Sequence, residues 1–294
     1  MAGNNQDYSY LPLNAEYIAT SLLPSCFAFE NLGWGPTFQG FVEYYLEAEF
    51  RQENVTHLST ATLPIVVLAS SAPDPFKTFD LKTRTHPDCI KTQRLIPGME
   101  DAELSFRQKT QKLFGSSKVP QFSFSVQVDC PTVIQMQNTI PIPFKIRIIP
   151  DRRRTSDIIV DVPQTIVLTS LTMKLEATTS VICDGSFSPH TASGTQNHHF
   201  GDKGTVLGLR SPITIPSDPD AKALDVGAFL ELSLHPQHAS VRGKSLHPFA
   251  QVYPSFITFN IKHSHRLRWD LILEMVGESL KVSGEQAISI LAAS

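Results

Sequence analysis

Two groups of closely spaced histidines are the first candidates for chemistry in this 294-residue chain. His263 and His265 are two residues apart, so on an extended strand both imidazoles would point the same way and could bind one metal ion. His198 and His199, with His190 upstream, lie in a polar stretch. Neither group has a cysteine or carboxylate at ligand spacing. We therefore interpret the first as a solvated turn and the second as an exposed loop, and we predict no cofactor.

Two sequences resemble fragments of enzyme motifs. The Gly-Lys-Ser at 243–245 matches the end of a phosphate-binding loop, but the full motif needs a glycine where His238 stands and a helix afterwards. The Gly-x-Ser-x-Gly turn of hydrolases does not occur. Glu47 and Glu49 are paired carboxylates, yet they alternate with apolar residues and fit the solvent side of a strand. We predict that the protein is not an enzyme and name no catalytic residue.

The densest basic run is the best sequence candidate for partner binding. Arg152, Arg153 and Arg154 follow one another, with Lys145 and Arg147 shortly before them. Guanidinium groups bind carboxylates and phosphates in a bidentate geometry, so an acidic or phosphorylated protein would fit these residues. The alternative is an exposed hairpin turn that charge keeps soluble.

Composition and charge exclude several classes of partner. The net charge is −3 at pH 7, and no general basic field favours nucleic acid or an anionic membrane. No apolar run approaches the roughly 18 residues that cross a bilayer, and the N-terminus lacks the pattern of a secretory signal. The four cysteines are scattered, which indicates reduced structural thiols. We therefore expect a cytoplasmic protein.

Period-two alternation of apolar and polar residues predicts short strands through most of the chain. Tyr253–Leu273 contains two such strands, joined by a polar connection at 262–266, and Trp269 is expected in the core. The continuous apolar run at 63–69 predicts a buried strand. The other predicted strands are 42–50, 122–130, 143–149, 158–162, 165–181, 229–234 and 288–291.

These strands without intervening helices predict an all-β fold made of sandwiches. Prolines and polar residues at 71–97 predict a linker or long loop, and 98–114 predicts at most a short helix. We divide the chain into a smaller N-terminal domain at 1–97, a linker at 98–117 and a C-terminal sandwich at 118–294. The polar residues at 183–204 are expected to form an exposed loop or hairpin tip.

The chain resembles fungal arrestin-like proteins in four stretches. Leu23-Pro24-Ser25 followed by 41–48 is similar to later strands of an arrestin N-terminal domain. The residues 95–97 with 103–107 resemble the interdomain segment. Pro120–Pro131 resembles the first strand of the C-terminal domain, and 253–261 with 267–271 its closing strands.

The resemblance implies tandem immunoglobulin-like β-sandwiches in a non-catalytic adaptor. Many fungal members link membrane transporters or receptors to a ubiquitin ligase and promote endocytosis, so the resemblance implies peripheral membrane association through cargo. Two departures matter. No Pro-Pro-x-Tyr or Leu-Pro-x-Tyr motif for WW domains occurs, and no Pro-Gly-Asp-x-Val-x-Gly segment precedes Leu22, so the first sandwich is expected to be partial.

Two alternatives remain open at this stage. One is a ligand-binding or metal-binding β-sandwich or an enzyme, with a pocket near His263 and His265. The other is a truncated arrestin fragment without function.

Overall fold

The chain is built almost wholly from β-strands. The computed structural model describes residues 9–12, 14–20, 23–32, 37–51, 59–68, 75–103, 106, 119–200, 212–217 and 222–293. Strands account for 54% of it and helices for 6%, which confirms the predicted all-β sandwich class.

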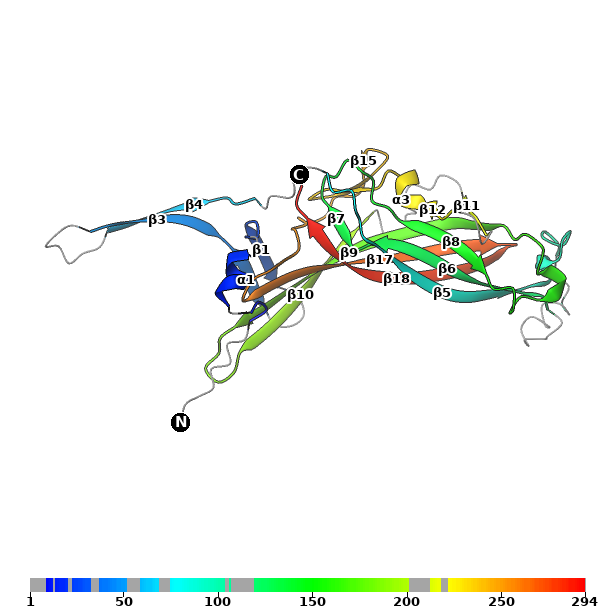
Figure 1. Cartoon of the computed structure of the whole chain (residues 1–294), viewed down its shortest axis with the longest axis horizontal. Helices are drawn as coiled ribbons and strands as arrows, with labels where there is room; N and C mark the ends of the chain where they lie inside the picture. Colours follow the sequence, from blue (N-terminus) through cyan, green and yellow to red (C-terminus); the bar gives the residue numbers. More distant parts are fainter. Residues whose placement is uncertain are drawn as a thin grey trace.

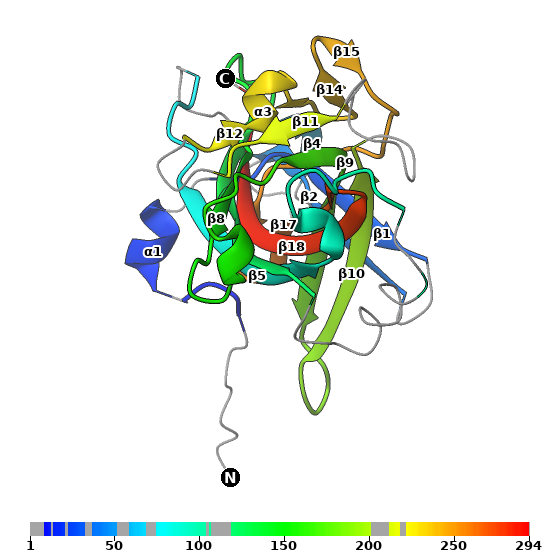
Figure 2. The same ribbon diagram turned by 90° about the vertical axis from the view of Figure 1, so that its right-hand side faces the viewer.

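Two facing sheets form the body of the molecule (Figures 1 and 2). The larger sheet has the order β10-β9-β17-β18-β7, and only its β18–β7 pair is parallel. Its strands are β7 (Val133–Gln135), β9 (Ile166–Cys183), β10 (His190–His199), β17 (Ile261–Met275) and β18 (Glu278–Leu291), with β11 (Ile213–Ile215) beside β9 and β16 (Phe256–Ile257) beside β17. The smaller sheet consists, in order, of β12 (Leu224–Asp225), β8 (Lys145–Pro150), β6 (Gln121–Pro131) and β5 (Leu81–Lys91).

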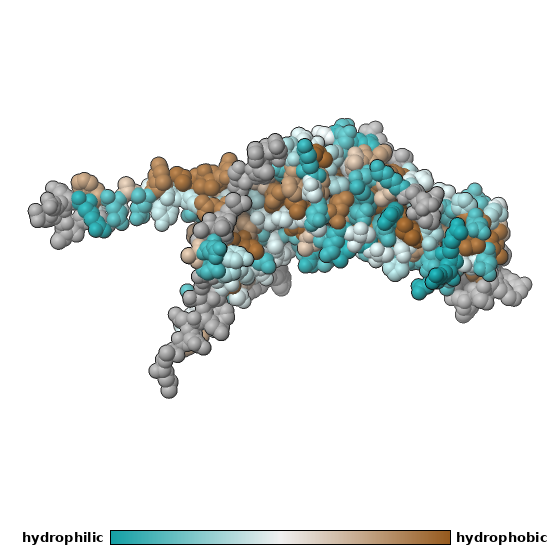
Figure 3. All heavy atoms as spheres, in the orientation of Figure 1, coloured by the Kyte–Doolittle hydropathy of each residue, from teal (hydrophilic) through white to brown (hydrophobic). Residues whose placement is uncertain are grey.

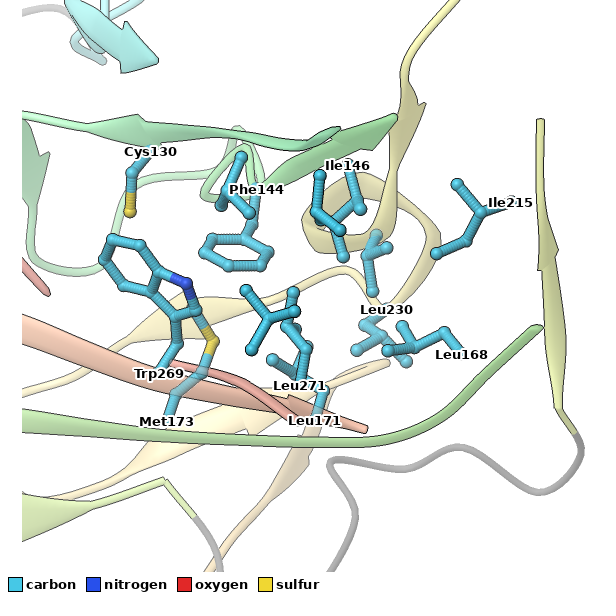
Figure 4. Close-up of a cluster of buried hydrophobic side chains, with 14 of the residues drawn as sticks. Cys130, Phe144, Ile146, Leu168, Leu171, Met173, Ile215, Leu230, Trp269 and Leu271 are labelled. Atoms are coloured by element: carbon cyan, nitrogen blue, oxygen red, sulfur yellow. The ribbon is translucent and has the colours of Figure 1, made fainter. Parts of the chain in front are cut away.

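The core lies between these sheets (Figure 4). Trp269 of β17 is 2% exposed, and its ring meets Phe144, which precedes β8, edge to face with centroids 5.7 Å apart. Such aromatic pairs add to the free energy that burial alone provides. The prediction that Trp269 lies in the core is confirmed. Leu171 of β9 and Ile146 of β8 are likewise buried in this cluster.

A β-bulge explains why the alternation of buried and less buried residues shifts by one position within β9. Buried residues fall on even numbers at Ile166 and Leu168, but on odd numbers at Leu171 and Met173. The pairing of β9 with β17 shifts between Ile272 and Leu273, so β9 has one extra residue there. An extra residue reverses the alternation and keeps both halves of the long strand facing the core.

Short elements pack against the sandwich and contribute buried residues such as Val226, Leu234 and Ala239 to its core. A three-stranded sheet comprises β13 (Ser233–Leu234), β14 (Ala239–Val241) and β15 (Lys244–Ser245). The helix α3 (Val226–Phe229) begins after Asp225, whose Oδ1 accepts the N–H of Ala228 at 3.0 Å. The remaining helical elements are α1 (Ala15–Thr20), η1 (Gln93–Leu95) and η2 (Asp157–Ile159).

Two N-terminal hairpins lie outside the sandwich sheets. The first, β1 (Phe27–Asn31) with β2 (Phe38–Val42), packs on the sandwich through Phe27, which is 3% exposed. The second, β3 (Tyr44–Phe50) with β4 (Ser59–Ile65), projects away from the body as an arm (Figures 1 and 3).

Several local predictions were wrong. The segment predicted as loop at 71–97 contains β5, which pairs along its whole length with β6 and so belongs to the sandwich. The segment at 183–204, predicted as an exposed loop or hairpin tip, holds the turn between β9 and β10 but also the whole of β10, and its residues 201–204 lie outside the described part. The short strand predicted at 158–162 begins as the turn η2, and the one at 229–234 is mostly helix end and turn. The possible helix at 98–114 lies mostly outside the described residues.

Candidate functional site

The β3–β4 hairpin presents an apolar face to solvent. Alternation places Leu46 and Ala48 on one face, and antiparallel pairing sets them opposite Leu63 and Ala61. Leu46 is 59%, Leu63 61% and the adjacent Phe50 66% exposed. Brown apolar atoms accordingly run along the upper side of the arm in Figure 3. The alternation was predicted correctly, but the expectation of a buried strand at 63–69 was wrong.

The opposite face of the hairpin is acidic and borders a groove. Glu43, Tyr45, Glu47 and Glu49 follow one another at every second residue, and all four are exposed. A groove of about 510 Å³ lies at the base of the hairpin; its lining comprises Cys26, Glu43, Tyr44, Tyr45, Glu47, Thr62, Pro64 and Ile65. It therefore combines apolar surface with two carboxylates and has no basic lining residue.

Hydrogen bonds fix the base of the arm. The Tyr44 hydroxyl donates to the carbonyl of Pro24 at 2.8 Å, and the Cys26 N–H donates to the carbonyl of Val67 at 2.8 Å. The Val67 N–H in turn donates to Cys26 Sγ at 3.2 Å. Burial raises the pKa of Tyr44, and the neighbouring Cys26 raises it further, so this phenol remains a donor. These hydrogen bonds hold the base of the hairpin against the segment that contains Pro24 and Cys26.

Both outer edges of the arm lack a partner strand within the described ranges. In them, β3 and β4 form a sheet of their own and pair only with each other. Pro64 lies within β4 opposite Tyr45, and proline is tolerated in a sheet where its missing N–H would face away from the neighbouring strand. The outer edge of β4 therefore lacks a donor at Pro64, whereas every residue of β3 has its N–H.

His263 and His265 lie in the protein interior. Strand β17 begins at Ile261 and runs through His263 and His265, each 4% exposed, so the predicted solvated turn at 262–266 was wrong. The actual turn is at 258–260, where the N–H of Thr258 donates to the carbonyl of Ile261 at 2.7 Å. Their burial follows from the strand period, because both residues share the core face with Leu267.

These two imidazole rings lie against each other, and each has a hydrogen-bond partner at one of its two nitrogens. Their centroids are 4.7 Å apart. Nδ1 of His263 is 2.9 Å from Thr179 Oγ1, and Nδ1 of His265 is 2.8 Å from Ser255 Oγ. Neither Nε2 atom has a hydrogen-bond partner in the part of the chain that the structure describes. Phe27 covers His263 with its ring 4.9 Å away, so β1 closes this end of the core.

Burial keeps the cluster neutral. Burial, with a smaller contribution from the nearby His198, lowers the pKa of His263 to about 4. Burial also lowers the pKa of His198 to about 4 and that of His265 well below its ordinary value. His198 is 1% exposed on β10, whereas His190 and His199 face solvent. In the described ranges, no three His, Cys, Asp or Glu residues are grouped so that they could hold a metal ion.

The basic residues do not form one concentrated patch. Lys145 and Arg147 lie on β8, where Arg147 Nε donates to Gln127 Oε1 at 2.7 Å. Arg152, Arg153 and Arg154 form the turn after β8. Acidic residues oppose two of them: Arg152 is 3.7 Å from Asp161, and Arg154 is 3.6 Å from Asp151. A role in partner binding stays a prediction for these five residues.

A pocket beside the small three-stranded sheet escaped sequence analysis. It encloses about 420 Å³ and includes Ser233, His235, His238 and Ser240 in its lining. Ser233 Oγ is 3.1 Å from His235 Nε2 and 2.6 Å from Ser240 Oγ. The rings of His235 and His238 stack with centroids 4.5 Å apart. No sequence signal marks this cluster, because the residues are brought together by two tight strand pairs.

The structure also explains the Gly-Lys-Ser sequence at 243–245 and the four cysteines. Lys244 and Ser245 form β15, and Gly243 adopts a positive φ of 69° in the turn before it, so no helix follows this Gly-Lys-Ser sequence. All four cysteines are free, as predicted. Burial raises the pKa of Cys130 to about 12, which keeps its thiol protonated and inert.

Comparisons with protein-family models and with curated proteins identify no relative. None of the helices in the described ranges has the length and apolar content needed to cross a bilayer. No protein-family model matches the chain, and no curated protein has a significant match to it.

Proposed function

We propose that this protein is a non-catalytic adaptor of arrestin-like type that acts in the cytoplasm. It would bind membrane transporters or receptors, or components of a ubiquitin ligase, and so direct membrane proteins into endocytosis. It would reach membranes only through this cargo. The four sequence stretches that resemble fungal arrestin-like proteins support this proposal, and so does the all-β sandwich fold.

One structural observation carries the proposal: the β3–β4 hairpin exposes an apolar face that no described residue covers. Leu46 and Leu63 are directly paired and more than half exposed. An amphipathic hairpin normally packs its apolar face on a second layer. Exposed apolar surface that is flanked by polar residues marks sites of protein association.

Photo-crosslinking from the hairpin tests the proposal directly. A benzophenone amino acid replaces Leu63 in one version of the full chain and Phe187, wholly exposed in the β9–β10 turn, in a control version. Both are exposed to membrane extracts and irradiated. Transporters, receptors or ubiquitin-ligase components captured from Leu63 but not from Phe187 support the adaptor. Equal capture from both sites, or none, contradicts it.

A second candidate function rests on the serine–histidine pocket. Ser233 lies within hydrogen-bond distance of His235 and Ser240, as in a nucleophile activated by a base. Burial lowers the pKa of His235, and neighbouring His238 adds to this, so the imidazole is neutral at pH 7 and able to accept a proton. Labelling of the full chain by a fluorophosphonate that Ser233→Ala abolishes would support a hydrolase. Absence of labelling would eliminate a serine hydrolase at this site.

A further inference from the structure

The chemistry of the two hairpin faces specifies the kind of partner that the proposed adaptor binds. This inference rests on the proposed function, because it concerns the same hairpin. On one face, Leu46, Ala48 and Phe50 alternate along β3 and are exposed. A strand that added to β3 would place every second side chain beside these three. Those side chains must be apolar, since only apolar surface removes this face from water.

The remaining side chains of such a strand would lie on the acidic face. Glu43, Glu47 and Glu49 occupy it, and the nearest counter-charge is Arg51, which lies 3.5 Å from Glu49. In that ion pair Arg51 is 80% exposed, so it neutralises Glu49 only weakly. Opposite charges on neighbouring strands stabilise a sheet, and like charges directly opposite destabilise it. Lysine or arginine therefore fits best at the alternate positions.

The open edge of β3 supplies the backbone partner. Pro64 removes a donor from the outer edge of β4, so β3 is the edge with a complete series of N–H and C=O groups. Peptides bind such edges by adding a strand; main-chain hydrogen bonds give affinity, and alternate side chains give specificity.

We propose that the outer edge of β3 binds an extended segment of a partner protein in which apolar residues alternate with lysine or arginine. The apolar residues cover Leu46, Ala48 and Phe50. The basic residues pair with Glu47 and Glu49, and one end of the segment reaches the groove at Glu43 and Tyr45.

The same charges disfavour two other occupants. A second copy of the chain that paired antiparallel along β3 would bring Glu47 and Glu49 against their equivalents. A membrane surface that carries anionic lipids would repel these carboxylates. A basic, alternating segment meets neither penalty.

Fluorescence anisotropy with synthetic peptides on the full chain provides the test. The probe is a fluorescein-labelled heptapeptide, Lys-Val-Lys-Val-Lys-Val-Lys, because β3 has seven residues. One control peptide replaces every lysine by glutamate, and another replaces every valine by glycine. We expect saturable binding of the first peptide that weakens with salt, and roughly tenfold weaker binding of both controls.

Charge reversal on the protein makes the test specific to β3. The variant Glu47→Lys with Glu49→Lys should lose roughly tenfold in affinity for the lysine peptide and gain affinity for the glutamate peptide. The matched control is Asp184→Lys with Glu274→Lys, which changes the net charge equally at exposed residues elsewhere. It should leave both affinities unchanged. Reversed preference for the glutamate peptide also shows that the hairpin variant is folded.

Any of the following outcomes would overturn the proposal. If the lysine–glycine peptide bound as tightly as the lysine–valine peptide, charge alone would account for the binding. Sedimentation of the chain with phosphatidylcholine vesicles, together with no peptide binding, would favour a lipid surface. A dimer that the hairpin variant abolishes would favour a second copy. If the peptide fails to bind but Leu63 still crosslinks to membrane proteins, the adaptor stands and this partner chemistry falls.

Discussion

At the scale of single residues, the buried histidines are the groups most sensitive to solution conditions. His198, His263 and His265 share one end of the core, and burial holds all three neutral. Their spacing was visible in the sequence, but their environment was not. Burial depends on which face of β17 packs inward, and the polar neighbours Lys262, Ser264 and Arg266 concealed that this stretch is a strand.

These histidines should make the protein less stable in mild acid. In the unfolded chain each titrates near its ordinary pKa of 6.5, whereas in the fold the pKa of His263 and of His198 is about 4. Above pH 6.5 both states are neutral, so the stability is fully present. As the pH falls below 6.5, only the unfolded chain gains protons, and the free energy of unfolding decreases until the folded pKa is reached. We expect a loss on the order of 2 kcal/mol per histidine at pH 5.

Urea unfolding at pH 7.5 and pH 5.0 measures this loss. His263→Gln should reduce the difference between the two pH values, because it removes one of the shifted groups. His199→Gln, at an exposed position on the same strand as His198, is the control and should preserve the difference. A wild-type stability that is constant over this range would contradict the neutral cluster.

A second residue-scale prediction concerns the contact between Trp269 and β18. Gly284 is the cross-strand partner of Trp269, and a Cβ added there would lie 2.7 Å from Cε2 of the indole. Gly284→Ala should therefore force the indole or the strand to shift and lower the free energy of unfolding by about 1–3 kcal/mol. Thermal unfolding checks this, with exposed Ser279→Ala on the same strand as a control near zero. An unchanged midpoint for Gly284→Ala would show that the core has room at this point.

At the scale of elements, two adjacent hairpins have different environments. The sequence predicts strands at 42–50 and 63–69, which fall on the β3–β4 hairpin, but it predicts no strand over β1 or β2. Phe27 in β1 is buried among Tyr253, Phe256 and His263, whereas Leu46 in β3 is exposed. Alternation determines which side chains share a face, but only the position of the second layer decides whether that face is buried.

The contact of β1 with the sandwich is expected to depend on one aromatic side chain. Phe27→Ala removes ring contacts at 4.9 Å to Tyr253, Phe256 and His263, so the β1–β2 hairpin should separate from the core. Water then reaches His263, and its pKa should rise from about 4 toward its ordinary value. An NMR titration of the histidine rings measures this shift. Phe187→Ala, which removes a wholly exposed ring, should leave the titration unchanged.

At the scale of the whole molecule, the sandwich and the arm are expected to be energetically separate. The all-β class followed from the sequence, because alternation or β-branched residues predict the long strands β6 and β9 and the second half of β17. The position of β5 could not be foreseen. Its proline, Pro87, and its charged residues resemble a loop, and its strand conformation comes from pairing with β6. Likewise, no residue within the arm predicts its exposure, which follows because no second layer covers it in the described part of the chain.

Removing the arm should leave the sandwich intact. Tyr44 and Ile65 are cross-strand partners, so an Asn-Gly turn can replace residues 45–64 without moving either end. We expect the thermal midpoint to change by no more than about 2 °C, since the side chains at 45–51 and 59–64, the described part of the removed range, are all exposed. By contrast, Leu171→Ala in the buried core should lower it by roughly 5 °C or more. A large fall on removal of the arm would show that it supports the sandwich.

The strand order of the large sheet also affects how the protein folds during synthesis. β17 lies between β9 and β18, although β9 is made about 90 residues before the end of β17. While the ribosome adds the intervening residues, the β9–β10 hairpin has no neighbouring strand on the edge of β9 that later pairs with β17. Because distant pairing of this kind slows folding, the nascent chain holds a long unpaired edge until its last strands emerge. Chaperone binding should therefore concentrate on β9 during that interval.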